Sequence, residues 1–306
     1  MRHAGRVTGT RGGAESAASG RRITVSVLRG AGFAGAFAAV YTLLIASVGG
    51  QSLDAGSFGA FSIVNEPFGS VVGSLRTGGV VVLALAASVV GVVALARRKW
   101  RSVVTAGIVV AVSFLGSEAL KRILPRPDLG DHGYADNTFP SGHMAIALSL
   151  ATAVAIMLTR ARWARVVTFL ALLIAGIVGC ASFVSYAHRP SDVLGAEVVV
   201  GLVLSCVLWR RSSAGRRHPV LAAAAAVCVV AGAVAAAAGG LVAVADPTGQ
   251  RLIVSGGWVL LTLASTALVI ALAPDLTDPR TDPDPRSRQK PRPARPAAPG
   301  AVPPPD

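Results

Sequence analysis

The sequence predicts an all-α membrane protein, a polytopic bundle of hydrophobic helices with a polar tail at each end. Two observations lead to this fold class. The 306 residues are 53% hydrophobic and only 14% charged, with a mean hydropathy of +0.61, and aromatic residues make up just 5%. The apolar residues, mostly Ala, Val, Leu and Gly, also come in long runs, which are typical of helices that cross a bilayer rather than of a soluble core.

Runs of about 18 to 25 apolar residues predict eight spans. Their approximate ranges are 25–48, 76–96, 102–121, 141–159, 166–187, 192–209, 219–245 and 252–273. The run Ala222–Ala238 alone also fits a buried soluble helix, but its apolar flanks make it long enough to span. The first span begins too late and is too long for an ordinary cleaved signal peptide, so we expect it to remain as an anchor.

Short loops between the spans predict a single core with two tails. We expect a six-span core over 24–211 and two additional spans over 219–273. Residues 1–23 are rich in Arg, Gly and Ser, and residues 274–306 alternate Pro with Asp and Arg. Because neither composition can bury a core, we expect a disordered basic arm and a disordered Pro-rich tail.

Basic residues are distributed unevenly between the two sides of this arrangement. One side gathers 23 of the 29 Lys and Arg residues, in both tails and three short loops, and the other keeps 6. Since cytoplasmic loops carry the excess of Lys and Arg, we expect both termini in the cytoplasm and a multi-pass protein of the cell membrane. The net charge of +14 is dispersed over these loops, which favours anionic lipid headgroups over nucleic acid as its partner.

Cysteines give no sign of a disulfide framework or a metal site. Cys180, Cys206 and Cys228 all fall within predicted spans, in an odd number and without metal-ligand spacing. They are interpreted as small core residues. Because no separate cluster of His, Cys and carboxylates accompanies them, we expect neither a metal nor another cofactor.

Polar segments gather at the outer ends of the spans. The third span ends in cations, with Lys121 followed by Arg126, which also fits a helix end whose basic side chains snorkel and complement the helix dipole. The fourth span opens with Pro140-Ser141-Gly142-His143, where free backbone N–H groups at a helix start suit a phosphate. His143 would stand beside that anion site.

The junction of the fifth and sixth spans carries a second histidine. Pro190 interrupts the helix, so that His188 closes one span while Ser191 and Asp192 lie at the start of the next. A carboxylate near an imidazole fixes its tautomer and leaves the other ring nitrogen available for attack or proton transfer. A polar tie between helices is the structural alternative.

Together these segments resemble the second and third motifs of the type 2 phosphatidic acid phosphatase family. Pro140-Ser141-Gly142-His143 is followed, 45 residues from one His to the next, by His188-x-x-x-Asp192. The resemblance implies a six-helix lipid phosphatase that works without metal. It implies His188 as the nucleophile, Asp192 as its orienting partner and His143 as the acid for the leaving oxygen. The implied phosphate ligands are Lys121, Arg126, Ser141 and Gly142.

Two departures from the family pattern concern phosphate-binding arginines. Lys121 is separated from Arg126-Pro127 by four residues instead of six, and the position seven beyond Lys121 is Asp128. Where the third motif opens with Ser-Arg, this chain has Ala181 and Ser182. Arg126 and Arg189 are candidates to replace the missing groups, since a bidentate Arg suits a phosphoryl group that gains charge.

Three functions of different classes remain open at this point. The first is a lipid phosphatase of the outer leaflet that hydrolyses a polyprenyl diphosphate or a phosphatidate-like lipid. The second is a degenerate family member that binds or moves phospholipid without hydrolysis, which would explain the missing arginines. The third is an unrelated transporter or structural membrane protein. The soluble vanadate-dependent haloperoxidases of the same family are disfavoured, because this chain has eight apolar spans.

Overall fold

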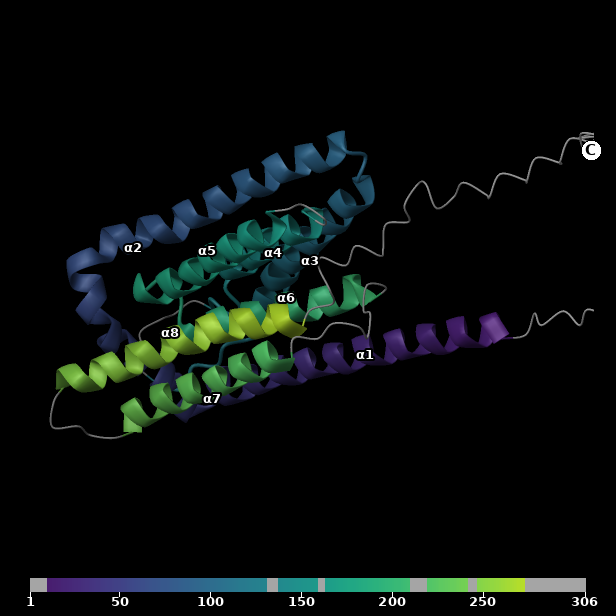
Figure 1. Cartoon of the computed structure of the whole chain (residues 1–306). Coiled ribbons are helices and arrows are strands. Elements are labelled where there is room, and N and C mark those ends of the chain that lie inside the picture. Colours follow the sequence, from purple (N-terminus) through teal and green to yellow (C-terminus); the bar gives the residue numbers. More distant parts are fainter. Residues whose placement is uncertain (1–9, 131–136, 159–162, 210–218, 242–246, 273–306) are drawn as a thin grey trace, which may run out of the picture.

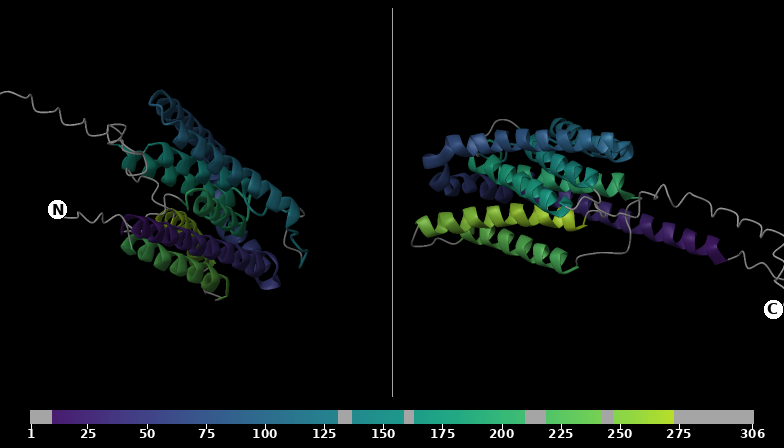
Figure 2. Two further views of the ribbon diagram at one scale, coloured as in Figure 1. Left: turned by 90° about the vertical axis from the view of Figure 1, so that its right-hand side faces the viewer. Right: turned by 45° about the horizontal axis from the view of Figure 1, so that its top comes forward.

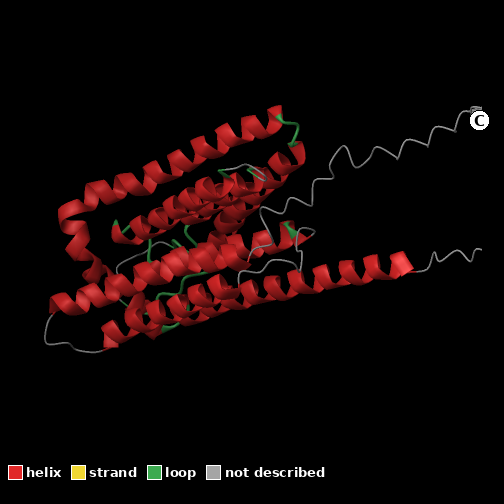
Figure 3. Cartoon of the chain, viewed as in Figure 1, coloured by secondary structure: helices red, strands yellow, loops and turns green. Residues whose placement is uncertain are grey.

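A computed structural model describes residues 10–130, 137–158, 163–209, 219–241 and 247–272. Within these residues the chain is helical and contains no strand, so the all-α polytopic bundle is confirmed (Figures 1 and 3). The elements are α1 (Thr10–Val40), the π-helical turn η1 (Tyr41–Ile45), α2 (Val48–Ala96), α3 (Trp100–Ile123), α4 (Gly142–Met157), α5 (Ala164–Val184), α6 (Pro190–Val207), α7 (Pro219–Leu241) and α8 (Pro247–Leu272).

Six of these helices are long and apolar enough to cross a membrane, namely those of α1, α2, α3, α5, α6 and α8. α4 has 16 residues, and the part of α7 over Ala223–Ala237 is likewise a shorter apolar helix. Large apolar side chains such as Leu85, Leu115 and Phe169 are exposed on the outside of the bundle. Because water would disfavour such a surface, the chain is a multi-pass membrane protein whose outside faces lipid.

The most enclosed helices are α4 and α6. Thirteen of the 16 residues of α4 are buried, among them Ser149 and Thr152, whose hydroxyls bond to carbonyls of their own helix. α6 has 14 buried residues, including Asp192 and Glu197. Most side chains on these two helices are therefore shielded from lipid, and both helices begin at the end of the bundle where the polar motifs lie.

α2 differs most from the expected spans. A span was predicted over 76–96 only, but the helix runs through 49 residues, about 74 Å at the rise of an α-helix. The preceding stretch looks like a loop because it is rich in Gly and Ser. It folds as a helix because Phe58 and Phe61 pack against Tyr186 and Phe183 at the end of α5. Tertiary packing thus overrides weak helix propensity.

α2 is bent into a short arm and a long arm (Figure 1). Pro67 is the proline inside the helix, and a proline there removes a backbone hydrogen bond and kinks the helix. We call residues 48–66 the outer arm and residues 68–96 the membrane arm. The outer arm is fixed by Asn65, which donates to Val184 O at 2.8 Å, and by Tyr186, which donates to Phe58 O at 3.1 Å. Burial raises the pKa of Tyr186, and the Glu66 carboxylate adds to the effect, so the phenol keeps its proton.

α1 also differs from its predicted range of 25–48. It begins at Thr10, inside the segment 1–23 that was expected to be disordered, and η1 continues it to Ile45. The segment from Thr10 has Ala, Glu and Arg on either side of its glycines, and it extends directly into the apolar span. Residues 1–9 and the predicted disordered tail 274–306 lie outside the described residues.

α7 and α8 lie with α1 on one side of the bundle, opposite α2 and α3 (Figures 1 and 2). α8 contacts both α2 and α6 through polar side chains. The Trp258 indole donates to Ser57 Oγ at 2.6 Å on the outer arm, and the Thr266 hydroxyl donates to Glu197 Oε1 at 2.6 Å on α6. The Ser265 hydroxyl donates to Glu197 Oε2. α8 therefore holds two helices of the core together.

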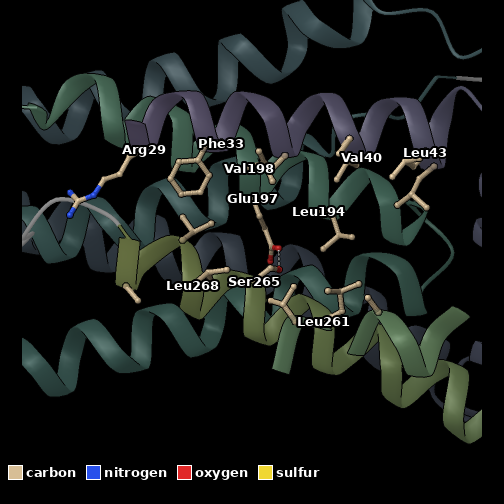
Figure 4. A pocket seen from close by; sticks show the side chains of 18 of the residues that line it. Arg29, Phe33, Val40, Leu43, Leu194, Glu197, Val198, Leu261, Ser265 and Leu268 are labelled. Atoms are coloured by element: carbon tan, nitrogen blue, oxygen red, sulfur yellow. Dashed lines mark hydrogen bonds between the residues drawn. The ribbon is translucent and has the colours of Figure 1, made fainter. Parts of the chain in front are cut away.

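A cavity of about 980 Å³ lies between α1, α6, α7 and α8 (Figure 4). Its walls are mostly apolar, with Phe33 from α1, Leu194 from α6 and Leu261 from α8 among them, and Arg29 of α1 also lines it. Glu197 and Ser265 meet across it, as Figure 4 shows. The cavity thus combines hydrocarbon walls with one carboxyl group held by hydroxyls.

Candidate active site

The polar motifs converge where α3 ends, where α4 begins and where α5 passes into α6. The loop before α4 is fixed to its neighbours. The Asn137 amide donates to Lys121 O at 2.9 Å and to Leu124 O at 2.7 Å. The Phe139 ring lies against Gly195 of α6, where a methyl group would come within 2.2 Å of the ring. Gly195 therefore allows the loop to approach α6 closely.

Asp192 is the centre of the hydrogen-bond network. Its side chain is fully buried in the first turn of α6, and its Oδ2 accepts from the Arg189 backbone N–H at 3.0 Å and the Thr138 hydroxyl at 2.5 Å. Its Oδ1 accepts from Arg126 Nη1 at 3.1 Å. Its main-chain oxygen accepts from the Ser141 N–H at 2.8 Å, which joins the starts of α4 and α6.

Arg126 bridges two buried carboxylates. Besides its bond to Asp192, its Nη2 donates to Asp54 Oδ2 at 3.1 Å, and its own side chain is only 6% exposed. Asp54, on the outer arm of α2, is fully buried and accepts from both the backbone N–H of Ser191, at 3.1 Å, and the Ser191 hydroxyl. A guanidinium between two carboxylates compensates charges that would otherwise be costly to bury.

The two histidines of the motifs face each other across the site. The rings of His143 and His188 have centroids 5.8 Å apart and an interplanar angle of 59°. His188 Nδ1 lies 3.8 Å from Asp192 Oδ2, which is an ion-pair distance, longer than a hydrogen bond. Such contacts are often long without substrate and shorten when it binds. The arrangement can place an imidazole on each side of one small group.

The start of α4 has the geometry expected of an anion site. Ser141 caps the helix, accepting from the Met144 N–H at 3.4 Å, and Gly142 is its first residue. A methyl group on Gly142 would lie 2.7 Å from Glu118 Oε1, the end of a flexible side chain, so an alanine there would displace only that carboxylate. Glu118 also pairs with Lys121 at 2.9 Å, so this lysine is tied to the end of α3. The unpaired N–H groups of a first helical turn remain a favourable place for a phosphate.

Two positions bear on the missing arginines. Arg189 is the residue that precedes and caps α6, and it is buried, with only 1% of its surface exposed. Ser182, in the position where the family pattern has Arg, is fully buried, and its hydroxyl donates to Val178 O at 2.7 Å. Its carbonyl accepts from the N–H groups of Ala187 and His188. Ser182 therefore shapes the turn that carries the histidine and brings no positive charge.

Sequence reasoning missed two residues of this network. Asp54 was overlooked because it falls between the predicted spans 25–48 and 76–96, although an aspartate between two apolar spans was a visible signal. Thr138 stands two residues before the second motif, yet nothing in its spacing indicated a bond to a carboxylate 54 residues away. Of the residues that the motifs singled out, the structure brings together His143, His188, Asp192, Arg126 and Ser141. It places Lys121 at the edge of the group, paired with Glu118.

The fold and this site define a multi-pass helical membrane protein with paired histidines and a buried carboxylate at one end of its bundle. The chain belongs to the PAP2 superfamily, whose family model matches residues 31–217, more than half of its length. The match runs from α1 to beyond α6 and leaves α7 and α8 outside. No curated protein and no solved structure gives a significant match. Family membership indicates a phosphoric ester hydrolase that acts on lipid-like substrates.

Proposed function

We propose that the protein hydrolyses the phosphate or diphosphate headgroup of a lipid at the outer leaflet of the cell membrane, through a phosphohistidine at His188. The observation that carries this proposal is the facing pair His143 and His188, 5.8 Å apart, with Asp192 behind His188. An imidazole with a carboxylate partner is suited to nucleophilic attack, and a second imidazole opposite it is suited to proton transfer.

In the first step Nε2 of His188 attacks phosphorus. The N–P bond forms as the bond between phosphorus and the lipid oxygen breaks, and His143 gives its proton to that oxygen, which leaves as the lipid alcohol or lipid monophosphate. Asp192 holds the proton on Nδ1 of His188, so that Nε2 presents its lone pair. The 3.8 Å separation of Nδ1 and Oδ2 requires only a small ring movement to reach hydrogen-bond distance.

In the second step water attacks the phosphohistidine. His143, now neutral, takes a proton from the water as its oxygen bonds to phosphorus and the N–P bond breaks. Inorganic phosphate leaves, and both histidines return to their starting states. The backbone N–H groups at Ser141 and Gly142, together with Lys121 and Arg189, are the groups proposed to bind the phosphoryl oxygens in both steps.

The alternative, a member that binds phospholipid without hydrolysis, is supported by the uncharged Ser182 and by the pairing of Lys121 with Glu118. Phosphate release distinguishes the two. The purified protein in detergent should release phosphate from at least one member of a panel of lipid phosphates and diphosphates. His188→Ala should abolish release, while His218→Ala, outside the motifs, should retain it. Wild-type lipid binding without any release would favour the alternative.

The role of His143 is tested by the leaving group. His143→Ala should slow a substrate with a poor alcohol leaving group much more than one with an activated phenol, because only the poor leaving group needs a proton. Equal losses for both substrates would assign His143 to binding instead.

The proposed orientation places the site outside and both termini inside the cell. It is tested by single cysteines in a background without Cys180, Cys206 and Cys228. Asp128→Cys, after α3, should react with a membrane-impermeant thiol reagent in intact cells, whereas Trp163→Cys, before α5, should react only after permeabilisation. The reverse pattern would overturn the orientation.

A further inference from the structure

An arginine lies within an apolar stretch of α2. Arg76 is on the membrane arm, with the apolar run Val80–Leu85 following within two turns. A charged side chain in a membrane-spanning helix is costly, and those that occur usually face the interior of the bundle and serve function. The position of Arg76 therefore calls for a partner inside the bundle.

The spacing along α2 shows which way Arg76 faces. Val72, Arg76, Gly79 and Leu83 follow one another at intervals of four, three and four residues, so they share one face of the helix. Val72 and Leu83 are both buried. Gly79 is packed so closely that a methyl group on it would lie 2.4 Å from Val178 Cγ2 of α5. Arg76 thus belongs to the inward face of the membrane arm.

The same packing sets the level of Arg76 along the bundle. α2 and α5 are antiparallel, because Asn65 bonds to Val184 near the outer end while Gly79 meets Val178 further in. One helical turn outward from this second contact leads to Arg76 on α2 and to Ser182 on α5. Arg76 on α2 therefore lies at the same height along the bundle as Ser182 on α5, the uncharged residue in the position where the family pattern has Arg.

The surroundings of Arg76 identify the partner. Arg76 lies close enough to the His143 ring for its charge to act on it, as do His188 and Lys121. Its Nε is buried and has no hydrogen-bond partner among the described residues. By contrast, Lys121 is paired with Glu118, and Arg126 is shared by Asp54 and Asp192. Arg76 thus brings to the histidine pair a positive charge that no described carboxylate takes up.

We infer that Arg76 binds a non-bridging oxygen of the phosphoryl group between His143 and His188, supplying from α2 the guanidinium that α5 lacks at position 182. A guanidinium is suited to this task because it stays charged and offers several donors to a phosphoryl group that gains charge. The inference rests on the proposed function, and it adds a phosphate ligand that neither polar motif contains.

Four variants test the inference: Arg76→Ala, Arg76→Lys, the double variant Arg76→Ala with Ser182→Arg, and the control Arg122→Ala at an exposed helix end. Arg76→Ala removes one such donor and should lower kcat/KM by a factor on the order of 100 to 1,000. Arg76→Lys should retain part of the activity, and the double variant should recover at least tenfold over Arg76→Ala, because the arginine returns at the same level. Arg122→Ala should stay within about threefold of wild type.

Inhibition by inorganic vanadate and thermal stability separate phosphate binding from a structural role. Arg76→Ala should weaken vanadate inhibition at least tenfold while its Tm in detergent stays unchanged. A lowered Tm with unchanged vanadate inhibition, or unchanged kcat/KM, would overturn the inference. If the wild type releases no phosphate from any lipid, the proposed function fails. The Tm measured with and without vanadate then tests the inference. If vanadate raises the Tm of the wild type but not that of Arg76→Ala, the inference is supported. If vanadate raises the Tm of the wild type and of Arg76→Ala equally, the inference is overturned.

Discussion

The bundle buries carboxyl groups in two regions, and their partners differ. At the end of the bundle where α4 and α6 begin, Asp54 and Asp192 share the guanidinium of Arg126. Beside the cavity between α1, α6, α7 and α8, Glu197 is held by the hydroxyls of Ser265 and Thr266. The carboxyl groups are buried in both regions, yet only the region of Arg126 shows carboxylates bonded to a cation beside a pair of histidines.

From this difference we expect Asp192 and Asp54 to serve the proposed chemistry and Glu197 to serve helix assembly. A carboxylate next to a cation is retained in its charged form and can orient a histidine. A carboxyl group held by hydroxyls from a neighbouring helix joins two helices inside the membrane, and such bonds contribute only modestly, on the order of 1 kcal/mol each. Substitutions that remove the acid but keep the shape should therefore have unequal effects in the two regions.

The largest effect is expected for Asp192→Asn. The amide cannot hold the proton on His188 Nδ1 as a carboxylate does, and it leaves Arg126 with one charged partner in place of two. We expect kcat/KM to fall on the order of 1,000-fold or more, with a clear drop in Tm. Steady-state kinetics and thermal unfolding in detergent measure both quantities. Activity within tenfold of wild type would show that Asp192 is not the orienting group.

A somewhat smaller effect is expected for Arg126→Lys. An ammonium keeps the charge but cannot donate in parallel to carboxylates on two helices, so the cost should be about 2–4 kcal/mol in transition-state stabilisation. The measurement is kcat/KM compared with Arg122→Lys, which makes the same change on an exposed side chain. Similar values for the two variants would remove Arg126 from the site.

Asp54→Asn should cost less, because the amide oxygen can still accept from Ser191. What is lost is one charged partner of Arg126, and we expect about 1–3 kcal/mol in stability or in kcat/KM. The matched control is Glu66→Gln, which neutralises an exposed acid on the same outer arm. If Glu66→Gln lowers stability and kcat/KM as much as Asp54→Asn does, the effect comes from the net charge of the outer arm and not from the bond to Arg126.

The smallest effect is expected for Glu197→Gln. The amide oxygen can accept from Thr266, and the Ser265 hydroxyl can turn to accept from the amide nitrogen, so less than about 1 kcal/mol should be lost. Activity should remain close to that of the wild type. A large loss of activity with unchanged Tm would contradict the assembly role and place Glu197 in the chemistry.

The sequence predicted the fold class and the residues of the two motifs, because hydrophobic runs and short motifs are local patterns. His143, His188 and Asp192 lie close together because each stands where a helix begins or ends at the same end of the bundle. Asp54 could not be found this way, because its bond to Ser191 joins residues 137 positions apart. Arg76 was counted among the outer basic residues, but its direction became clear only from the packing of Gly79 against Val178.

The bent helix α2 also restricts how the chain can vary in length. Asp54 lies on its outer arm and Arg76 on its membrane arm, 22 residues apart within one unbroken helix. Inserting one residue between them would turn one side chain by about 100° relative to the other and shift it by about 1.5 Å. Residues 128–130, which follow α3, are not helical and are under no such constraint. Insertions and deletions should therefore be tolerated there and eliminated from the segment between Asp54 and Arg76.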